Sequence, residues 1–154
     1  APTDGWGPQR PESPEPFSIV GSDERMRVER GDEMYMPFSA IGAFRMYQNS
    51  TLYHGTAFMV GPNVALTAAH CVFDNGSSYD NMTFAPGQNG SSAPFGTAAV
   101  TEYYYPQEWE DTHNSKYDWA VIKLSTNVGN SCGWFGIIDY ATLSNPGNFL
   151  LISG

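Results

Sequence analysis

Short apolar runs, each about as long as a β-strand, most constrain how this chain can fold. The runs are rich in β-branched and aromatic residues, and Gly, Pro and Asn separate them. This pattern is typical of strands joined by tight turns, and no stretch has a sustained helical period. We therefore expect an all-β domain, a barrel or a sandwich, with one short helical turn at residues 68–72. The expected strands span residues 39–46, 55–60, 63–67, 82–85, 97–105, 119–124 and 149–152.

Three other segments stand out by their turn-forming or charged residues. Residues 1–17 hold five of the 11 prolines, and because proline is excluded from helix interiors and central strands they predict an extended tail. Residues 74–96 are dense in Asn, Gly, Ser and Pro, which predicts an exposed pair of loops carrying a small hairpin. Residues 107–116 form a charged run, which favours a solvated loop over a metal site.

The charge balance excludes two classes of partner. The formal net charge is −9, from 16 acidic and 7 basic residues, so the chain offers no basic surface to nucleic acid or to anionic membranes. No apolar run approaches the roughly 18 residues of a membrane span. The sequence begins at Ala1 rather than Met, without a cationic and then apolar signal segment. We therefore expect a soluble chain from which a leader has been removed.

Sequons and cysteines bear on the compartment. Asn-x-Ser/Thr sequons favour a secreted glycoprotein. The two cysteines allow one internal disulfide, two free thiols, or bridges to another polypeptide, and the sequence alone leaves these alternatives open. The sequons lie at Asn49, Asn75, Asn81 and Asn89, and the cysteines are Cys71 and Cys132.

Two residues at the ends of expected strands could carry chemistry together. His70 follows the strand at 63–67 through small residues, and Asp118 precedes the apolar strand at 119–124. Alone, each is more often a structural or turn residue. Together they provide a base and a carboxylate to orient it, two members of a Ser-His-Asp triad. The chain offers no convincing third member, because Ser131 sits in a Gly-x-Ser-x-Gly pattern that needs a strand–turn–helix context.

Longer motifs around these residues resemble the chymotrypsin-like serine peptidases, and the glutamyl endopeptidase branch in particular. The His and Asp motifs are specific when they occur in this order, and the flanking matches are individually weak. The resemblance covers residues 19–154. Its motifs are Leu-Thr-Ala-Ala-His-Cys at 66–71, Tyr-Asp-Trp-Ala-Val-Ile-Lys-Leu at 117–124, Gly-Thr-Ala-Phe at 55–58, Ile-Val-Gly-Ser-Asp at 19–23, Pro-Gly-Gln-Asn at 86–89, Asn-Val-Gly-Asn at 127–130 and Ile-Ser-Gly at 152–154.

The resemblance implies a two-barrel fold of which this chain holds the first part. His70 would be the general base and Asp118 its orienting partner, while the nucleophilic serine, oxyanion amides and specificity pocket would belong to the second barrel. Residues 18–140 would form the first, six-stranded antiparallel barrel. Residues 141–154 would form the crossover and the first strand of an incomplete second barrel. A strand without a sheet exposes unpaired amides, so we expect a second polypeptide chain to complete the fold.

On this interpretation the chain is part of a secreted serine endopeptidase that is inactive alone and needs neither cofactor nor metal. Cleavage after Glu or Asp is implied by the resemblance only. In this branch the mature chain starts near Ser18 or Ile19, so residues 1–17 would be either a retained pro-segment or a harmless tail. The usual partner of Cys71 is replaced by Tyr53, which leaves a bridge to Cys132 or to an absent chain.

Two other classes of function compete with this interpretation. A non-catalytic binding or regulatory module that kept the peptidase scaffold would carry the same His and Asp as remnants. A metal hydrolase would have to use His54, His70 and His113, whose spacing fits no common ligand pattern.

Overall fold

The computed structural model describes residues 27–137. The expected tail at 1–17 and the crossover and strand at 141–154 lie outside these residues. The strands are β1 (Ile41–Gln48), β2 (Thr51–Met59), β3 (Val64–Thr67), β4 (Phe73–Asp74), β5 (Ser77–Ser78), β6 (Asp80–Pro86), β7 (Ala98–Tyr104) and β8 (Ala120–Leu124). The helices are η1 (Asp32–Met34), η2 (Phe38–Ala40), η3 (Ala69–Cys71), α1 (Gln107–Thr112), η4 (Ser115–Tyr117) and α2 (Gly129–Cys132).

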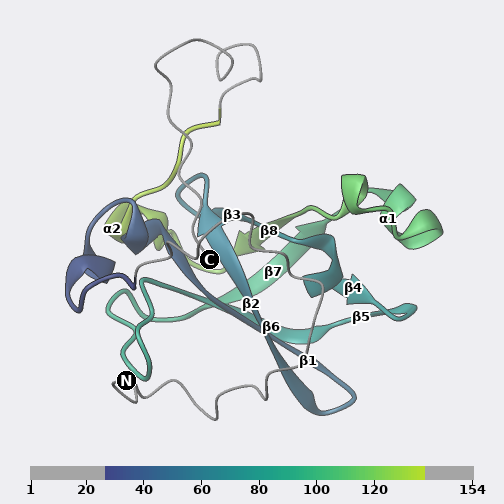
Figure 1. The fold of residues 1–154 in the computed structure, drawn as a ribbon, viewed down its shortest axis with the longest axis horizontal. Coiled ribbons are helices and arrows are strands. Elements are labelled where there is room, and N and C mark those ends of the chain that lie inside the picture. Colours follow the sequence, from purple (N-terminus) through teal and green to yellow (C-terminus); the bar gives the residue numbers. More distant parts are fainter. Residues whose placement is uncertain (1–26, 138–154) are drawn as a thin grey trace, which may run out of the picture.

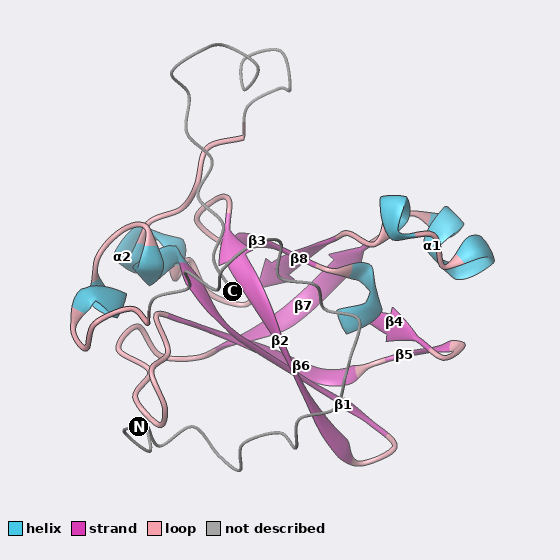
Figure 2. Ribbon diagram, in the orientation of Figure 1, coloured by secondary structure: helices cyan, strands magenta, loops and turns pink. Residues whose placement is uncertain are grey.

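Six strands close into one antiparallel barrel in the order β1-β2-β3-β8-β7-β6, with β1 paired to β6. Figure 1 shows the barrel, with α1 and α2 on opposite sides of the view, and Figure 2 shows that the helices are short and peripheral. The predicted all-β class and six-stranded barrel are confirmed. Among the helices of residues 27–137, none is long and apolar enough to cross a membrane.

The barrel interior is filled largely by alternate residues of β1, β2, β3 and β8. Strand side chains point alternately to the two faces of a sheet, and in β1 the buried residues are Phe44 and Met46. The same alternation buries Ala57 and Met59 of β2 and, in β8, Ala120, Ile122 and Leu124. These side chains belong to one hydrophobic cluster. Alternate burial along these strands therefore defines the core.

The predicted strand boundaries differ most at the β1–β2 hairpin, where β2 begins at Thr51 instead of residue 55. Asn49 and Ser50 both have positive φ, 50° and 65°. A two-residue hairpin turn with both residues in this region follows the twist of the flanking strands, and Asn is one of the residues that tolerates it best. The turn lies within the expected connection at 47–54, and both strands extend further into it than predicted.

The expected solvated loop at 107–116 is partly wrong, because it contains α1. The acidic residues Glu108 and Glu110 lie in the first turn of this helix, where they complement the helix dipole. His113 ends the helix in the left-handed conformation, with its N–H bonded to the carbonyl of Trp109. The expected hairpin after residue 74 is present as β4 and β5.

The bridge between Cys71 and Cys132 that the sequence left open is absent, because both cysteines are free and buried. Cys71 packs against β2, with its Sγ 2.8 Å from where a Cβ on Gly55 would lie. The position of its expected partner is taken by Tyr53, whose ring meets Tyr79 edge-on. Cys132 lies on α2, where its carbonyl accepts a hydrogen bond from Ser39. The two cysteines therefore pack in different places, Cys71 against β2 and Cys132 on α2.

We expect Gly42→Ala to destabilise the barrel. A Cβ at this position would lie 2.1 Å from the carbonyl oxygen of Ala85 and 2.5 Å from the Cα of Pro86, and backbone cannot give way as a flexible side chain can. Overpacking costs roughly 1–3 kcal/mol or more, which urea unfolding of the chain would measure. Gly136→Ala is the matched control, because a Cβ there meets nothing within 4 Å. Equal stability of the two variants would contradict the close approach of β1 and β6.

Candidate active site

Strand pairing brings His70 and Asp118 together. β3 pairs antiparallel with β8, and Thr67 at the end of β3 is opposite Ala120 at the start of β8. The residues just after β3 must therefore lie beside those just before β8. His70 is in η3, directly after β3, and Asp118 ends η4, directly before β8.

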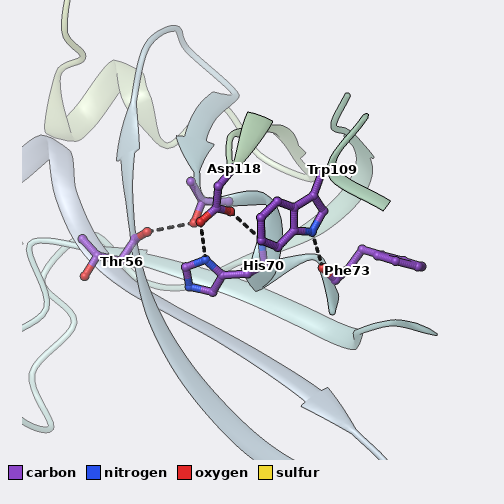
Figure 3. Close-up of polar contacts among 6 residues, drawn as sticks. Thr56, His70, Phe73, Trp109 and Asp118 are labelled. Carbon is purple, nitrogen blue, oxygen red and sulfur yellow. Dashed lines mark hydrogen bonds and ion pairs between the residues drawn. The ribbon is translucent and has the colours of Figure 1, made fainter. Parts of the chain in front are cut away.

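Asp118 holds His70 with both carboxylate oxygens. Oδ1 accepts the backbone N–H of His70 at 2.9 Å, and Oδ2 lies 2.7 Å from the imidazole Nδ1. An ionised carboxylate only accepts hydrogen bonds, so Nδ1 carries the proton and donates, which leaves Nε2 free to act as a base in the neutral ring. Figure 3 shows both contacts. The arrangement fixes the tautomer and the orientation of the ring.

The aromatic neighbours of Asp118 leave its side chain partly exposed. Trp119 is 44% exposed, and its ring is tilted toward that of Tyr104 at 6.2 Å. Tyr117 lies under the ammonium group of Lys116. The Asp118 side chain is 22% exposed, and that of His70 is 53% exposed. The backbone amide that donates to the Asp118 carboxylate is that of His70.

The site strongly favours the protonated form of the imidazole. The pKa of His70 is raised to about 9, first by the neighbouring Cys71 side chain and then, against the lowering effect of partial burial, by the hydrogen bond and charge of Asp118. Near neutral pH the imidazole in this exposed site therefore carries a proton. In this state Asp118 faces an imidazolium.

This geometry occurs in a known family. The Trypsin family model matches residues 38–154. The chain belongs to the trypsin family. Its barrel resembles a solved structure of Glu endopeptidase in complex with MPD, with a TM-score of 0.64, 33% identity, and coverage of 76% of this chain and 53% of that chain.

Curated relatives agree with the glutamyl endopeptidase resemblance. The glutamyl endopeptidase of Bacillus licheniformis is 37% identical over 139 residues, which is 89% of this chain and 42% of that protein. A Bacillus subtilis protein named extracellular metalloprotease is 36% identical over 123 residues, which is 79% of this chain and 39% of that protein. The chain thus spans less than half the length of either relative.

The other serine and histidine candidates lie apart from the His70–Asp118 pair. Ser131 is on α2, where its N–H bonds to the carbonyl of Val128. His54 is an exposed residue of β2, opposite Arg45, and the ring of His113 contacts Trp109. Within residues 27–137, no group of three or more His, Cys, Asp or Glu side chains is arranged to hold a metal ion.

Trp109 was not predicted from the sequence to be a site residue, but in the structure it lies beside His70. It is the buried residue of α1, and its ring centroid lies 6.4 Å from that of His70. The one signal for it was an aromatic residue inside a run of acidic ones. An isolated aromatic in a charged segment is more easily interpreted as part of a solvated loop than as an anchor.

Three of the four sequons lie at exposed turns or strand ends. Asn49 is in the β1–β2 turn, Asn75 in the β4–β5 turn, and Asn81 in β6, each with φ near 50°. The β1–β2 and β4–β5 turns are close together. Gln48, next to Asn49, donates a hydrogen bond to the carbonyl of Asp74, next to Asn75. Asn89 differs, since its Nδ2 donates to the Glu33 carboxylate at 3.2 Å.

We expect Asn89 to be the least occupied sequon in a host that attaches N-glycans. The glycan would be attached to the nitrogen that now donates to Glu33, whereas Asn49, Asn75 and Asn81 are exposed. Peptide mapping by mass spectrometry, before and after enzymatic removal of glycans, gives the occupancy of each site. Glu33→Gln is a matched variant that keeps an acceptor. Higher occupancy at Asn89 than at Asn49 would contradict the expectation.

We expect the His70–Asp118 pair to make folding stability depend on pH between about 6.5 and 9. Because the pKa of His70 is raised in the folded chain, its contribution is complete below the unfolded value of about 6.5 and is lost as pH rises through about 9. Urea unfolding at several pH values, with NMR titration of His70, tests this. Asp118→Asn should lower the pKa and weaken the pH dependence without abolishing it, because the neighbouring Cys71 side chain raises the pKa most, whereas Asp111→Asn on α1 should change neither. An unchanged His70 titration in Asp118→Asn would disprove the coupling.

Proposed function

We propose that the chain is the His- and Asp-bearing part of a secreted serine endopeptidase. The observation that supports it best is the two-point contact of Asp118 with the backbone and ring of His70, in a barrel of the trypsin family. A carboxylate that fixes the imidazole tautomer is what the general base of acyl transfer requires. The nucleophilic serine, the oxyanion donors and the specificity pocket would come from the rest of the peptidase fold.

In the proposed reaction, Nε2 of His70 takes the proton of the serine Oγ as the oxygen attacks the peptide carbonyl. The imidazolium then gives this proton to the leaving amine, and an acyl-enzyme remains. Water, deprotonated by the same nitrogen, attacks the acyl carbonyl and releases the acid. Asp118 stays ionised throughout and stabilises the imidazolium.

We expect this chain to be inactive alone because it lacks the nucleophile, the oxyanion donors and the pocket, and the protonation of His70 would add to this. A base must be neutral to accept a proton, and here the pKa of His70 is raised to about 9. A partner polypeptide and a bound substrate would cover the imidazole and remove water from it. Desolvation disfavours the charged form of a histidine and lowers its pKa. Completion of the fold would therefore supply the serine and also adjust the base.

Cleavage after Glu or Asp and secretion form a finer part of the proposal. The names of two similar proteins, glutamyl endopeptidase and Glu endopeptidase, support an acidic preference. Secretion is supported by the exposed sequons and by the similarity to the extracellular metalloprotease of B. subtilis. Peptide libraries with Glu, Asp, Gln or Leu before the scissile bond would measure the preference.

The decisive experiment compares His70 and Asp118 variants of the complete natural protein. Asp118→Asn should lower kcat on the order of 10⁴-fold, as loss of this carboxylate does in Ser-His-Asp enzymes, because the imidazole is left in the wrong tautomer. His70→Ala should cost at least as much, whereas His54→Ala and Asp111→Asn are matched controls that should keep full activity. Labelling by a serine-directed phosphonate should follow the same order.

Two results would refute the proposal. Natural protein that carries no serine-bearing second barrel by intact mass and peptide mapping, and that neither cleaves peptides nor reacts with the phosphonate, would instead indicate a non-catalytic binding module on this scaffold. Full activity of Asp118→Asn would show that the peptidase uses another mechanism.

A further inference from the structure

Four side chains join the segment after His70 to the helix before Asp118. The indole N–H of Trp109 in α1 donates to the carbonyl of Phe73 in β4 at 2.9 Å. The ring of Phe73 stacks on that of Tyr105, with centroids 5.5 Å apart. The hydroxyl of Tyr105 in turn donates to the carboxylate of Glu110, again in α1. We call this closed set, Phe73, Tyr105, Trp109 and Glu110, the clamp.

Trp109 is the central member of the clamp. It is 7% exposed and is the buried residue of α1, so the attachment of this short helix to the barrel depends on it. An indole buries a large apolar area, and when buried its N–H normally needs an acceptor. The carbonyl of Phe73 meets that need three residues after His70. This hydrogen bond therefore holds α1 against the backbone segment that follows His70.

The Trp109 ring also lies near two imidazoles. Its centroid is 6.4 Å from that of His70 and 5.0 Å from that of His113, tilted by 52° in each case. Figure 3 shows the indole beside the His70–Asp118 pair, with its N–H turned toward Phe73. A protonated imidazole is favoured near the face of an indole. Asp118 thus holds the ring of His70 through Nδ1, and Trp109 limits the space beside it.

The chain from α1 to Asp118 is short and capped at each step. His113 ends α1 in the left-handed conformation, and the side chain of Asn114 accepts the N–H of Lys116 to cap η4. Asp118 is the residue that ends η4. With so few residues between, a change in the position of α1 would be passed on to Asp118. The clamp therefore connects both members of the pair.

We propose that Trp109 is a positioning residue for the His70–Asp118 pair, acting through the clamp. It touches no reacting atom. Its effect on catalysis rests on the proposed function, whereas its effect on the geometry of the pair does not. Misplacement of a catalytic group by about 1 Å costs up to ~10²-fold in rate, so a loosened clamp should lower kcat and leave KM nearly unchanged.

The test replaces the indole by a ring without its N–H. In the 154-residue chain, Trp109→Phe should weaken the downfield NMR signal of the His70 Nδ1 proton and lower the pKa of His70. In the complete natural protein, it should lower kcat roughly ten- to hundredfold. Trp134→Phe is the matched control, because Trp134 is 44% exposed and lies outside the clamp. This control should change none of these quantities.

The NMR readout separates positioning from simple stability. If Trp109→Phe lowers only the stability of the chain and leaves the Nδ1 signal and pKa of His70 unchanged, the proposal is wrong. If this variant does not fold, Tyr105→Phe decides in the same way, since it removes the hydroxyl bond to Glu110 and keeps the stacked ring. If the complete wild-type protein has no peptidase activity, the proposed function fails, but the NMR comparison still tests the clamp.

Discussion

The antiparallel pairing of β3 with β8 is the contact on which the site depends. It joins two strands far apart in the sequence and places Thr67 opposite Ala120. His70 and Asp118, 48 positions apart, thereby come within hydrogen-bond distance. The pairing in turn relies on the filled interior of the barrel, because one register puts Ala65 and Ile122 on the buried face. A shift of β8 by one residue would turn Ile122 and the other buried side chains of that strand outward.

The site is rigid on its barrel side and open on the other. Asp118 fixes the backbone and the ring of His70, and the clamp supports both from α1. About half of the His70 side chain nevertheless remains exposed. In the proposed function this exposed half is where the serine and the substrate would meet Nε2. The arrangement would let the barrel set the geometry of the base, while completion of the fold would set its protonation.

The strands could be predicted from sequence because their signal is local. Alternation of buried residues marks β1, β2 and β8, and the largest boundary error arose where a hairpin turn uses Asn49 and Ser50 instead of Gly. The helix α1 was missed because its amphipathic signal is reduced to Trp109. The state of Cys71 and Cys132 could not be predicted, because it depends on which elements those residues pack against. His70 and Asp118 were identified as a pair from the order and content of their motifs, and not from any expected distance.

By itself the sequence determined the fold class, the approximate strands, and the two residues most able to act as base and orienting carboxylate. Period-two burial and short specific motifs are encoded in neighbouring residues, so they can be read without knowledge of long-range contacts. Only the tertiary structure decided how Asp118 holds His70, that Trp109 lies beside them, and that the two thiols remain apart. These features depend on the packing of segments distant in the chain, which closure of the barrel fixes.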